Sequence, residues 1–205
     1  MTNVAVIYYS STGNVHKLAV AAAAAAEKAG AEVRLLRVPE LAPESAINAK
    51  EAWAKHHAET KDAPVASLDD LVWADAILFG TPTRYGLPAA QLKQFIDTTG
   101  GLWHEGKLVN KVVSSFTSTA TTHGGQESTL LALNNTFYHW SSIIVPPGYA
   151  DKIQFAASNG NPYGTSNVSG SRPDMVNDEN LGAIEFQARR MVEIATALKR
   201  GLEAA

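Results

Sequence analysis

The segment Ser10-Ser11-Thr12-Gly13-Asn14 is the part of this sequence best suited to chemistry. It follows a short apolar run, residues 4–9, and precedes an alanine-rich stretch that is predicted to be a helix. Backbone N–H groups at the start of a helix lack acceptors and lie at the positive end of the helix dipole. Together with the hydroxyl groups of the segment, they predict an anion-binding site.

The composition of this segment favours one compact phosphate group. It has one glycine and no lysine, so it matches neither the G-x-x-x-x-G-K-[ST] loop of nucleoside-triphosphate proteins nor the G-x-G-x-x-G of dinucleotide folds. A hydrogen bond to a charged group contributes about 1.5 to 3 kcal/mol. A phosphomonoester therefore fits better than a diphosphate. The alternative is a simple helix cap, because Ser, Thr and Asn are preferred there whatever the function.

Two further polar segments follow predicted strands. Residues 81–86 present Arg84 and Tyr85 beside a proline that favours a turn, and residues 117–125 are mostly Thr, Ser and Gly. The simpler interpretations are surface side chains for the first segment and a flexible loop for the second. In a parallel sheet, however, such loops share the carboxyl edge, where ligands bind. A phosphate pocket with two walls for a planar ring predicts a site for flavin mononucleotide (FMN).

The elements that would position these loops alternate along the chain. Short apolar runs rich in β-branched residues predict buried strands. These runs are residues 4–9, 32–38, 76–79, 111–116 and 143–145. Helical patterns occur at residues 15–29, 91–97, 127–138 and 181–198. Alternating strands and helices imply right-handed parallel crossovers, so the predicted fold class is α/β, a doubly wound five-stranded parallel sheet with helices on both faces.

The chain of 205 residues is predicted to form a single domain, residues 1–205, with two insertions at about 39–67 and 146–180. The first surrounds Trp53, His56 and His57, and the second is rich in Gly, Ser, Asn and Pro. Long connections of this kind tend to be functional or to dock on a neighbouring subunit. We predict no metal site, because adjacent histidines on a helix point apart and no carboxylate at standard spacing completes a set.

Composition excludes several other classes of protein. The net charge is -3 and the 17 basic residues are scattered, which argues against nucleic-acid binding. There is no cysteine, so disulfides, thiolate metal sites and cysteine nucleophiles are excluded, and a reducing compartment is favoured. The longest apolar stretch is far too short for a membrane span, and no basic-then-apolar leader follows Met1. We therefore expect a cytoplasmic enzyme or carrier without a membrane partner.

Five motifs carry a resemblance to a known family: GTPTRYG at 80–86, TGGLW at 99–103, GGQE at 124–127, IVPPGY at 144–149 and NPYG at 161–164. Over nearly its whole length the sequence resembles the WrbA-type NAD(P)H:quinone oxidoreductases of the flavodoxin-like superfold. The resemblance implies non-covalent FMN and two-electron reduction of quinones to hydroquinones by NADH or NADPH. It also implies a homotetramer in which neighbouring subunits complete the pocket. Nicotinamide and quinone would occupy one site in turn, which implies ping-pong kinetics without a required catalytic acid or base.

The resemblance also assigns site residues by position. The residues assigned to the cofactor are Ser10, Ser11, Thr12, Gly13, Asn14, Val15, Pro82, Thr83, Arg84, Tyr85, Ser118, Thr119, Ala120, Thr121, Thr122, His123, Gly124 and His139. His139 would approach FMN across the subunit boundary, and the alternative is a satisfied interface histidine. Trp103 would form a substrate-stacking wall, and the alternative is a core residue. Family members often have an aromatic residue near position 12, which here is Thr12, and the loop 117–125 is one residue longer than the family pattern.

Two other functions remain open at this stage. A flavodoxin-type electron carrier would use the same cofactor, although such carriers are commonly shorter and more acidic than this chain. An FMN-binding scaffold without turnover would share every residue of the site. A phosphoacceptor receiver is not supported, because it needs acidic residues after its first strand and Tyr9-Ser10-Ser11 supplies none.

Overall fold

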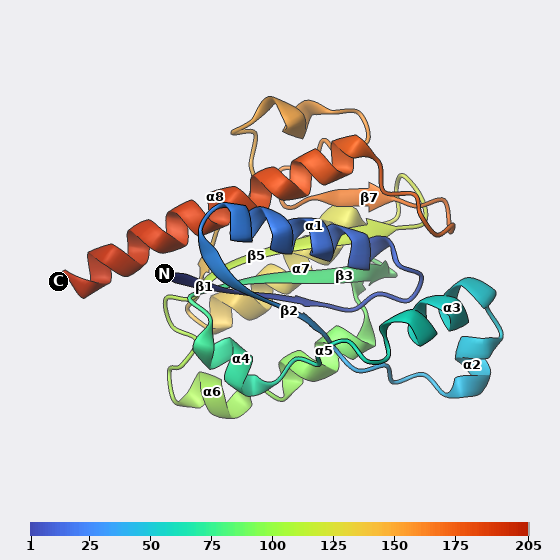
Figure 1. Cartoon of the computed structure of the whole chain (residues 1–205), viewed down its shortest axis with the longest axis horizontal. Helices are drawn as coiled ribbons and strands as arrows, with labels where there is room; N and C mark the ends of the chain where they lie inside the picture. Colours follow the sequence, from blue (N-terminus) through green and yellow to red (C-terminus); the bar gives the residue numbers. More distant parts are fainter. Residues whose placement is uncertain (205) are drawn as a thin grey trace.

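A computed structural model describes residues 1–204, and a parallel β-sheet lies at the centre of the molecule (Figure 1). Five strands lie in the order β2-β1-β3-β5-β6, and all of these neighbouring pairs are parallel. Their bounds are β1 Thr2–Tyr8, β2 Ala31–Arg37, β3 Ala76–Arg84, β5 Val112–Thr119 and β6 Ile143–Ile144. The predicted parallel α/β sheet is confirmed, and each of its five predicted strands is present.

The sheet has seven strands, so the prediction of five is only partly right. The two extra strands are β4 (Leu87–Pro88), antiparallel to β3, and β7 (Ser166–Val168), parallel to β5. Residues 81–84, which the proline suggested would leave the sheet, instead continue β3, where Pro82 lies beside Ser118. The chain turns only at Tyr85 and Gly86, whose positive φ values of 56° and 79° suit a tight hairpin turn.

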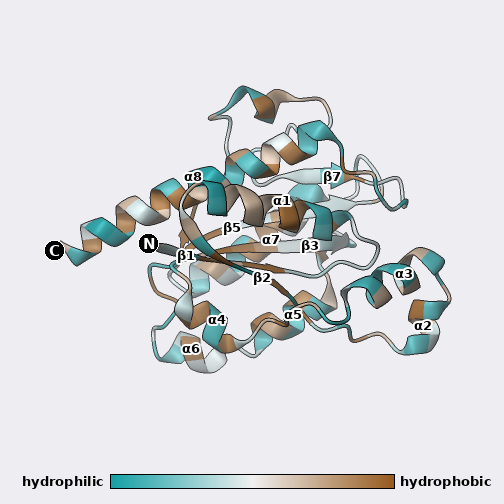
Figure 2. Cartoon of the chain, in the orientation of Figure 1, coloured by the Kyte–Doolittle hydropathy of each residue, from teal (hydrophilic) through white to brown (hydrophobic). Residues whose placement is uncertain are grey.

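Helices cover both faces of this sheet. The helices are α1 Asn14–Lys28, α2 Glu44–Asn48, α3 Glu51–Thr60, α4 Leu68–Trp73, α5 Ala90–Asp97, α6 Gly100–His104, α7 Gln126–His139 and α8 Asp178–Glu203, with a 3₁₀ turn at Lys152–Phe155. Side chains of α1 and α8 form one hydrophobic core with the sheet, and side chains of α4, α5 and α7 form the other. Figure 2 shows the hydrophobic strands between helices whose outer surfaces are mostly hydrophilic. Because both faces of the sheet are buried, the sequences of the central strands are continuous apolar runs.

The ends of the long helices follow local capping chemistry. Helix α1 ends at Lys28, Ala29 is its cap, and Gly30 follows with a φ of 89°, as expected for glycine just past a helix end. Helix α8 begins at Asp178, three residues before the predicted start. There the Asn177 side chain accepts a hydrogen bond from Asn180 N at 2.9 Å, and the Asn180 side chain accepts one from Asn177 N. This reciprocal pair adds a first turn that apolar periodicity alone does not reveal.

Neither long insertion is structureless. Residues 39–67 contain α2 and α3, and residues 146–180 contain the 3₁₀ turn, β7 and the first turn of α8. Buried amide side chains hold the second insertion: Asn167 Nδ2 donates to Asn180 Oδ1 at 3.0 Å, and Gln187 Oε1 accepts from Thr165 N at 2.8 Å. Because buried polar groups need partners, these contacts fix the insertion against the sheet.

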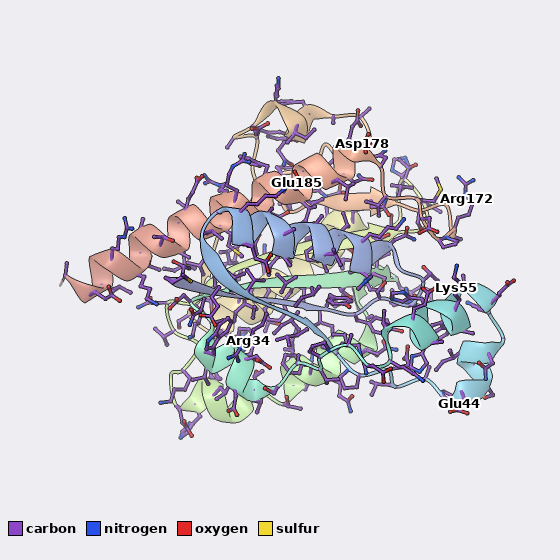
Figure 3. All side chains as sticks on the ribbon, in the orientation of Figure 1. Arg34, Glu44, Lys55, Arg172, Asp178 and Glu185 are labelled. Atoms are coloured by element: carbon purple, nitrogen blue, oxygen red, sulfur yellow. The ribbon has the colours of Figure 1, made fainter. Side chains whose placement is uncertain are left out.

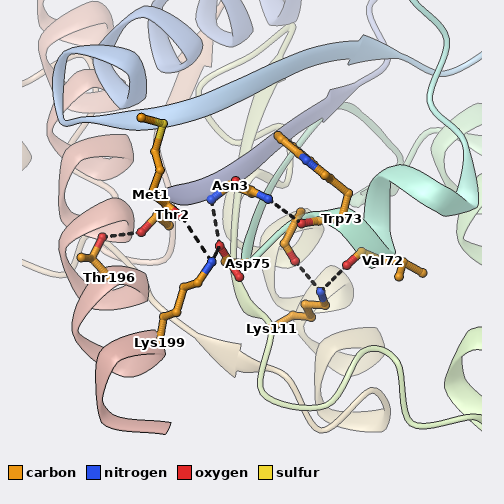
Figure 4. Close-up of polar contacts among 10 residues, drawn as sticks. Met1, Thr2, Asn3, Val72, Trp73, Asp75, Lys111, Thr196 and Lys199 are labelled. Carbon is orange, nitrogen blue, oxygen red and sulfur yellow. Dashed lines mark hydrogen bonds and ion pairs between the residues drawn. The ribbon is translucent and has the colours of Figure 1, made fainter. Parts of the chain in front are cut away.

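Polar contacts join several elements at the amino-terminal edge of the sheet (Figure 4). The Asp75 carboxylate accepts from Asn3 N at 2.9 Å and pairs with Lys199 of α8 at 2.8 Å. The Lys111 ammonium donates to the carbonyls of Val72 and Ala74. The Asp75 contacts tie α8 to the chain start, and the Lys111 contacts tie the start of β5 to the end of α4. Within residues 1–204, no helix has the length and apolar character needed to cross a bilayer.

Candidate functional site at the carboxyl edge of the sheet

A cavity of about 560 Å³ opens where β1, β3 and β5 end. This volume lies in the usual range for small-molecule sites. Its lining residues are Ser10, Ser11, Thr12, Asn14, Val15, Lys50, Trp53, Pro82, Thr83, Arg84, Tyr85, Ser118, Thr119, Ala120, Ser169 and Ser171. All three predicted loops thus contribute to one cavity. Its lining includes two basic side chains and no carboxylate, which favours an anionic ligand.

The first wall is the turn between β1 and α1. Gly13 has a φ of 97°, and Ser10 Oγ accepts a hydrogen bond from Gly13 N at 3.1 Å, which closes the turn. The first intrahelical bond runs from Lys17 N to the Gly13 carbonyl, so the amides of residues 14–16 have no acceptor within the helix. These are the amides from which the sequence predicts anion binding.

The Asn14 side chain makes two hydrogen bonds to the second insertion. Its Nδ2 donates to the Arg172 carbonyl at 2.8 Å, and its Oδ1 accepts from Met175 N at 3.0 Å. Asn14 therefore joins the first turn of α1 to the second insertion. The Asn14 backbone amide has no acceptor within the helix, whereas the Asn14 side-chain amide makes these two hydrogen bonds.

The rings of Tyr8, His16 and His56 form a cluster next to this turn. The Tyr8 hydroxyl and His16 Nδ1 are hydrogen-bonded at 2.7 Å, and the His16 and His56 rings are 5.3 Å apart. A side-chain carbon added at Gly13 would lie 3.6 Å from His56 Nδ1. Burial, with smaller contributions from His16 and His57, lowers the pKa of His56 to about 4. His56 is therefore neutral at pH 7, and the turn rests on an uncharged ring.

The second wall is the end of β3 with its hairpin turn. Thr83 Oγ1 shares a hydrogen bond with Thr129 Oγ1 at 2.7 Å and accepts another from Gly86 N at 3.2 Å. Arg84 Nη2 donates to Ser11 Oγ at 3.3 Å, which links the second wall to the first. Tyr85 is fully exposed, so its ring is available to a ligand or to another chain.

The third wall is the end of β5, and only part of the predicted loop reaches the cavity. Ser118, Thr119 and Ala120 line it, whereas residues 121–124 do not. The Gln126 side chain donates to the Thr122 carbonyl at 3.0 Å, and Thr119 Oγ1 donates to the Thr121 carbonyl at 2.9 Å. These bonds hold residues 121–124 close to the start of α7. The residues of this loop that fail to line the cavity are Thr121, Thr122, His123 and Gly124, and Gly13 of the first wall does not line it either.

Comparison with known proteins agrees with this geometry. A family model described as NADPH-dependent FMN reductase matches residues 2–156. A protein of Deinococcus radiodurans named NAD(P)H dehydrogenase (quinone) is 46% identical over 194 residues, which is 95% of this chain and 96% of that protein. One of the same name from Sinorhizobium fredii is 46% identical over 202 residues, 97% of this chain and 99% of its own length. This chain belongs to the NAD(P)H dehydrogenase (quinone) family.

Solved structures show the same fold for the family member described here. A WrbA-like flavodoxin of Agrobacterium tumefaciens aligns with a TM-score of 0.64 at 24% identity, covering 96% of this chain and 99% of that one. A flavodoxin from the domain Archaea aligns with a TM-score of 0.59 at 16% identity, covering 97% and 99%. These structures confirm the flavodoxin-like fold, and the relatives of 46% identity confirm the predicted resemblance to NAD(P)H:quinone oxidoreductases.

Two residues assigned to the family site lie away from the cavity within this chain. Trp103 is on α6, and His139 ends α7 at the opposite edge of the sheet, because α7 returns the chain from the end of β5 to the start of β6. Trp103 Nε1 donates to the His139 carbonyl at 2.8 Å. Trp103 is 54% exposed, so its interpretation as a core residue is wrong. In one copy of the chain, neither side chain lines the cavity.

Sequence reasoning missed four residues of the cavity, Lys50, Trp53, Ser169 and Ser171. All four come from the two insertions, whose length was the available signal. Figure 3 shows Lys55 on α3 and Arg172 after β7 at the same end of the molecule, the end at which the strands finish. The described residues contain no group of three His, Asp or Glu side chains placed to hold a metal ion.

Proposed function

We propose that this family member binds FMN in the cavity and uses NADH or NADPH to reduce quinones to hydroquinones. The main support for this proposal is the cavity. Three strands end around helix amides that lack an acceptor within the helix and around hydroxyl groups, and no carboxylate lines the cavity. The family to which the chain belongs carries enzymes named for this reaction. FMN and the nicotinamide coenzymes are the implied cofactor and co-substrate.

The phosphate of FMN fits the turn formed by residues 10–15. The amides of residues 14–16 have no helical acceptor, and the hydroxyls of Ser11 and Thr12 line the same space. The donors are neutral and the underlying His56 is neutral at pH 7, so the charge of the phosphate is met by hydrogen bonds and by the helix dipole. Gly13 lets the backbone approach closely, since its φ of 97° is unfavourable for other residues.

The ring of FMN fits between the second and third walls. Pro82, Thr83, Arg84 and Tyr85 would hold one side, and residues 118–124 the other. Support comes from Pro82 and Ser118, which are neighbours across β3 and β5, so the two walls begin at the same height in the sheet. Residues 121–124 would contribute through the backbone of the rim, because they do not line the cavity in this chain.

The chemistry would be supplied by bound FMN, which accepts a hydride from nicotinamide and delivers two electrons to the quinone. The chain would orient these partners and limit access of water. Because the three walls share a single cavity, nicotinamide and quinone would enter it in turn, which predicts ping-pong kinetics. No side chain of the cavity is an evident acid or base, and none is assigned a catalytic role.

We also propose that the chain, as one domain, works as a homotetramer in the cytoplasm. Trp103 and His139 are exposed at the opposite edge of the sheet, so they could serve a flavin site only in another copy. Trp103 would then stack on the quinone and His139 would approach FMN. The absence of cysteine fits a reducing compartment.

The test compares Ser10→Asp with Ser10→Asn. Both side chains can accept the bond from Gly13 N that Ser10 accepts, but only Asp adds a negative charge beside the phosphate. We expect Ser10→Asp to weaken FMN binding at least 30-fold and Ser10→Asn less than fivefold, measured by flavin fluorescence titration. Equal affinities for the two variants would refute the phosphate site.

Turnover distinguishes the enzyme from its alternatives. FMN-loaded protein mixed anaerobically with NADH or NADPH should lose its oxidised flavin absorbance and regain it on adding benzoquinone. A flavodoxin-type carrier would leave the flavin oxidised. A scaffold would show negligible steady-state benzoquinone reduction at full FMN occupancy.

A further inference from the structure

Lys50 and Trp53 bring one face of an insertion helix into the cavity. Lys50 is the cap residue of α3, and the Lys50 carbonyl accepts a hydrogen bond from Trp53 N at 2.9 Å. The two residues are three positions apart, so their side chains share one side of the first turn. Both line the cavity together with Ser11 and Thr12. This part of the wall is not among the residues that the family resemblance assigns to FMN.

The Trp53 ring is held in place. Its Nε1 donates to Glu40 Oε2 at 3.0 Å, and the same carboxylate accepts from Tyr9 at 2.6 Å and from Gln91 at 2.6 Å. Glu40 follows β2, Tyr9 follows β1 and Gln91 lies on α5, so the indole is anchored to the sheet and to the helix layer. A half-buried indole fixed by its N–H end presents an aromatic surface to the cavity.

The Lys50 ammonium is a cation without a protein partner in the described part of the chain. Of the two cations in the lining, Arg84 already donates to the Thr83 carbonyl and to Ser11 Oγ. Nearby Lys17 pairs with Asp174 at 2.6 Å, and Lys55 with Glu59 at 3.9 Å. No hydrogen bond or ion pair joins the Lys50 ammonium to any residue from 1 to 204, and no carboxylate lines the cavity.

A fixed indole beside an unpaired ammonium suits an aromatic base that carries a phosphate. Among the ligands of the proposed function, on which this inference rests, the phosphate of FMN already has the turn at residues 10–15. A quinone carries no phosphate. The nicotinamide coenzymes bring a second aromatic base, adenine, with phosphate groups attached to its ribose.

We propose that Lys50 and Trp53 form the subsite for the phosphoadenosine half of NADH or NADPH. Trp53 provides the surface against which the adenine packs, and Lys50 pairs with a phosphate. That phosphate is either the diphosphate that both coenzymes share or the 2′-phosphate that only NADPH carries. The two positions give different results in the following experiment.

Binding is measured without turnover, by calorimetric titration of the FMN-loaded protein with ADP and with adenosine 2′,5′-bisphosphate. Lys50→Ala should weaken binding of at least one of these probes tenfold or more, and Lys50→Glu should weaken it further. A loss confined to the bisphosphate places the ammonium at the 2′-phosphate, and a similar loss for both probes places it at the diphosphate. Lys55→Ala is the matched control, since Lys55 is exposed on the same helix outside the cavity lining, and it should change either affinity less than twofold.

Trp53→Phe tests the second half of the subsite. It keeps an aromatic surface but loses the bond to Glu40, so it should bind the probes more weakly than the wild type and more tightly than Trp53→Ala. Probe affinities within twofold of wild type in both Lys50→Ala and Trp53→Ala would overturn the proposal. So would a loss of FMN affinity in Lys50→Ala with the probes unaffected, because the ammonium would then serve the flavin phosphate.

Reduced nicotinamide mononucleotide separates this proposal from the proposed function, because it delivers hydride but has no adenosine. In anaerobic single-turnover reduction, Lys50→Ala should slow the reaction with the affected coenzyme at subsaturating concentration at least fivefold more than the reaction with the mononucleotide. Equal slowing would overturn the subsite. If the wild-type flavin is reduced by none of the three donors, the proposed function itself fails, whatever the titrations show.

Discussion

Replacing Glu40 by Gln should destabilise the attachment of α3 through one identifiable hydrogen bond. The Glu40 carboxylate accepts five hydrogen bonds, three at Oε1 and two at Oε2. Burial alone would raise the pKa of Glu40, but the bonds from Tyr9, Ala42, Gln91 and Leu41 together lower it. The carboxylate is therefore ionised at neutral pH and acts only as an acceptor.

The magnitude follows from the donors that face each oxygen. In Glu40→Gln, the amide oxygen is best placed at Oε1, because two backbone amides donate there. The new NH₂ group then faces Tyr9 and Trp53. The Tyr9 hydroxyl can rotate to accept, but the indole N–H can only donate, so one charge-assisted bond is lost. Such a bond is worth about 1.5 to 3 kcal/mol, and partial exposure of Trp53 favours the lower end, about 2 kcal/mol.

A double-mutant cycle isolates this bond. Urea denaturation would be followed by far-ultraviolet circular dichroism at pH 7 and one fixed FMN concentration. Glu40→Gln should cost about 2 kcal/mol in the wild type and close to nothing in a Trp53→Phe background, where no indole N–H remains, so the coupling energy should be about 2 kcal/mol. Glu44→Gln, an exposed change on α2, should stay within about 0.5 kcal/mol. Equal costs of Glu40→Gln in both backgrounds, within about 0.3 kcal/mol, would refute the reasoning.

Two further predictions concern the sheet and the histidine cluster. A side-chain carbon at Gly80 would lie 2.3 Å from Phe116 Cζ, so Gly80→Ala should lower the free energy of unfolding, measured in urea, by about 2 to 3 kcal/mol. The control Gly201→Ala adds a carbon in open space and should cause no loss. An unchanged free energy of unfolding in Gly80→Ala would contradict the packing of Phe116 on Gly80. The pKa of His56 is about 4, below the value of about 6.5 expected when unfolded, so the unfolded state binds the proton first and stability is lost as pH falls from about 6.5 to 4. With solvent screening, this loss is about 1 to 2 kcal/mol, and the stability difference between wild type and His56→Gln should shrink by that amount over this range. Parallel pH curves for wild type and His56→Gln would contradict the burial of a neutral ring.

Much of the fold can be predicted from the sequence because its signals are local. Apolar runs predicted the five central strands, alanine content and the following glycine predicted α1, and apolar periodicity predicted α8, since each of these signals lies within the element itself. The turn at residues 10–14 was recognisable because glycine and hydroxyl residues between a strand and a helix determine its chemistry locally. Its place at the carboxyl edge then followed from the parallel order of the strands.

Local signals also misled where a distant neighbour overrode them. Pro82 suggested that the chain leaves the sheet, yet β3 pairs with β5 as far as Pro82 and then with β4 at Thr83 and Arg84. The exposure of Trp103 could not be read from its type, since an isolated tryptophan is more often buried. In both cases the deciding contact lies more than 30 residues away along the chain.

The sequence by itself determined the five central strands, the main helices and the turn at residues 10–14, because strand burial, helix formation and turn chemistry depend on neighbouring residues. Only the tertiary structure decided that Lys50 and Trp53 enter the cavity and that Asn14 uses its side chain to hold Met175. Asn14 and Met175 are 161 residues apart, and Trp53 is oriented by Glu40 from outside its own helix. Contacts between such distant segments depend on how the insertions pack against the sheet, and no periodicity within either segment encodes that packing.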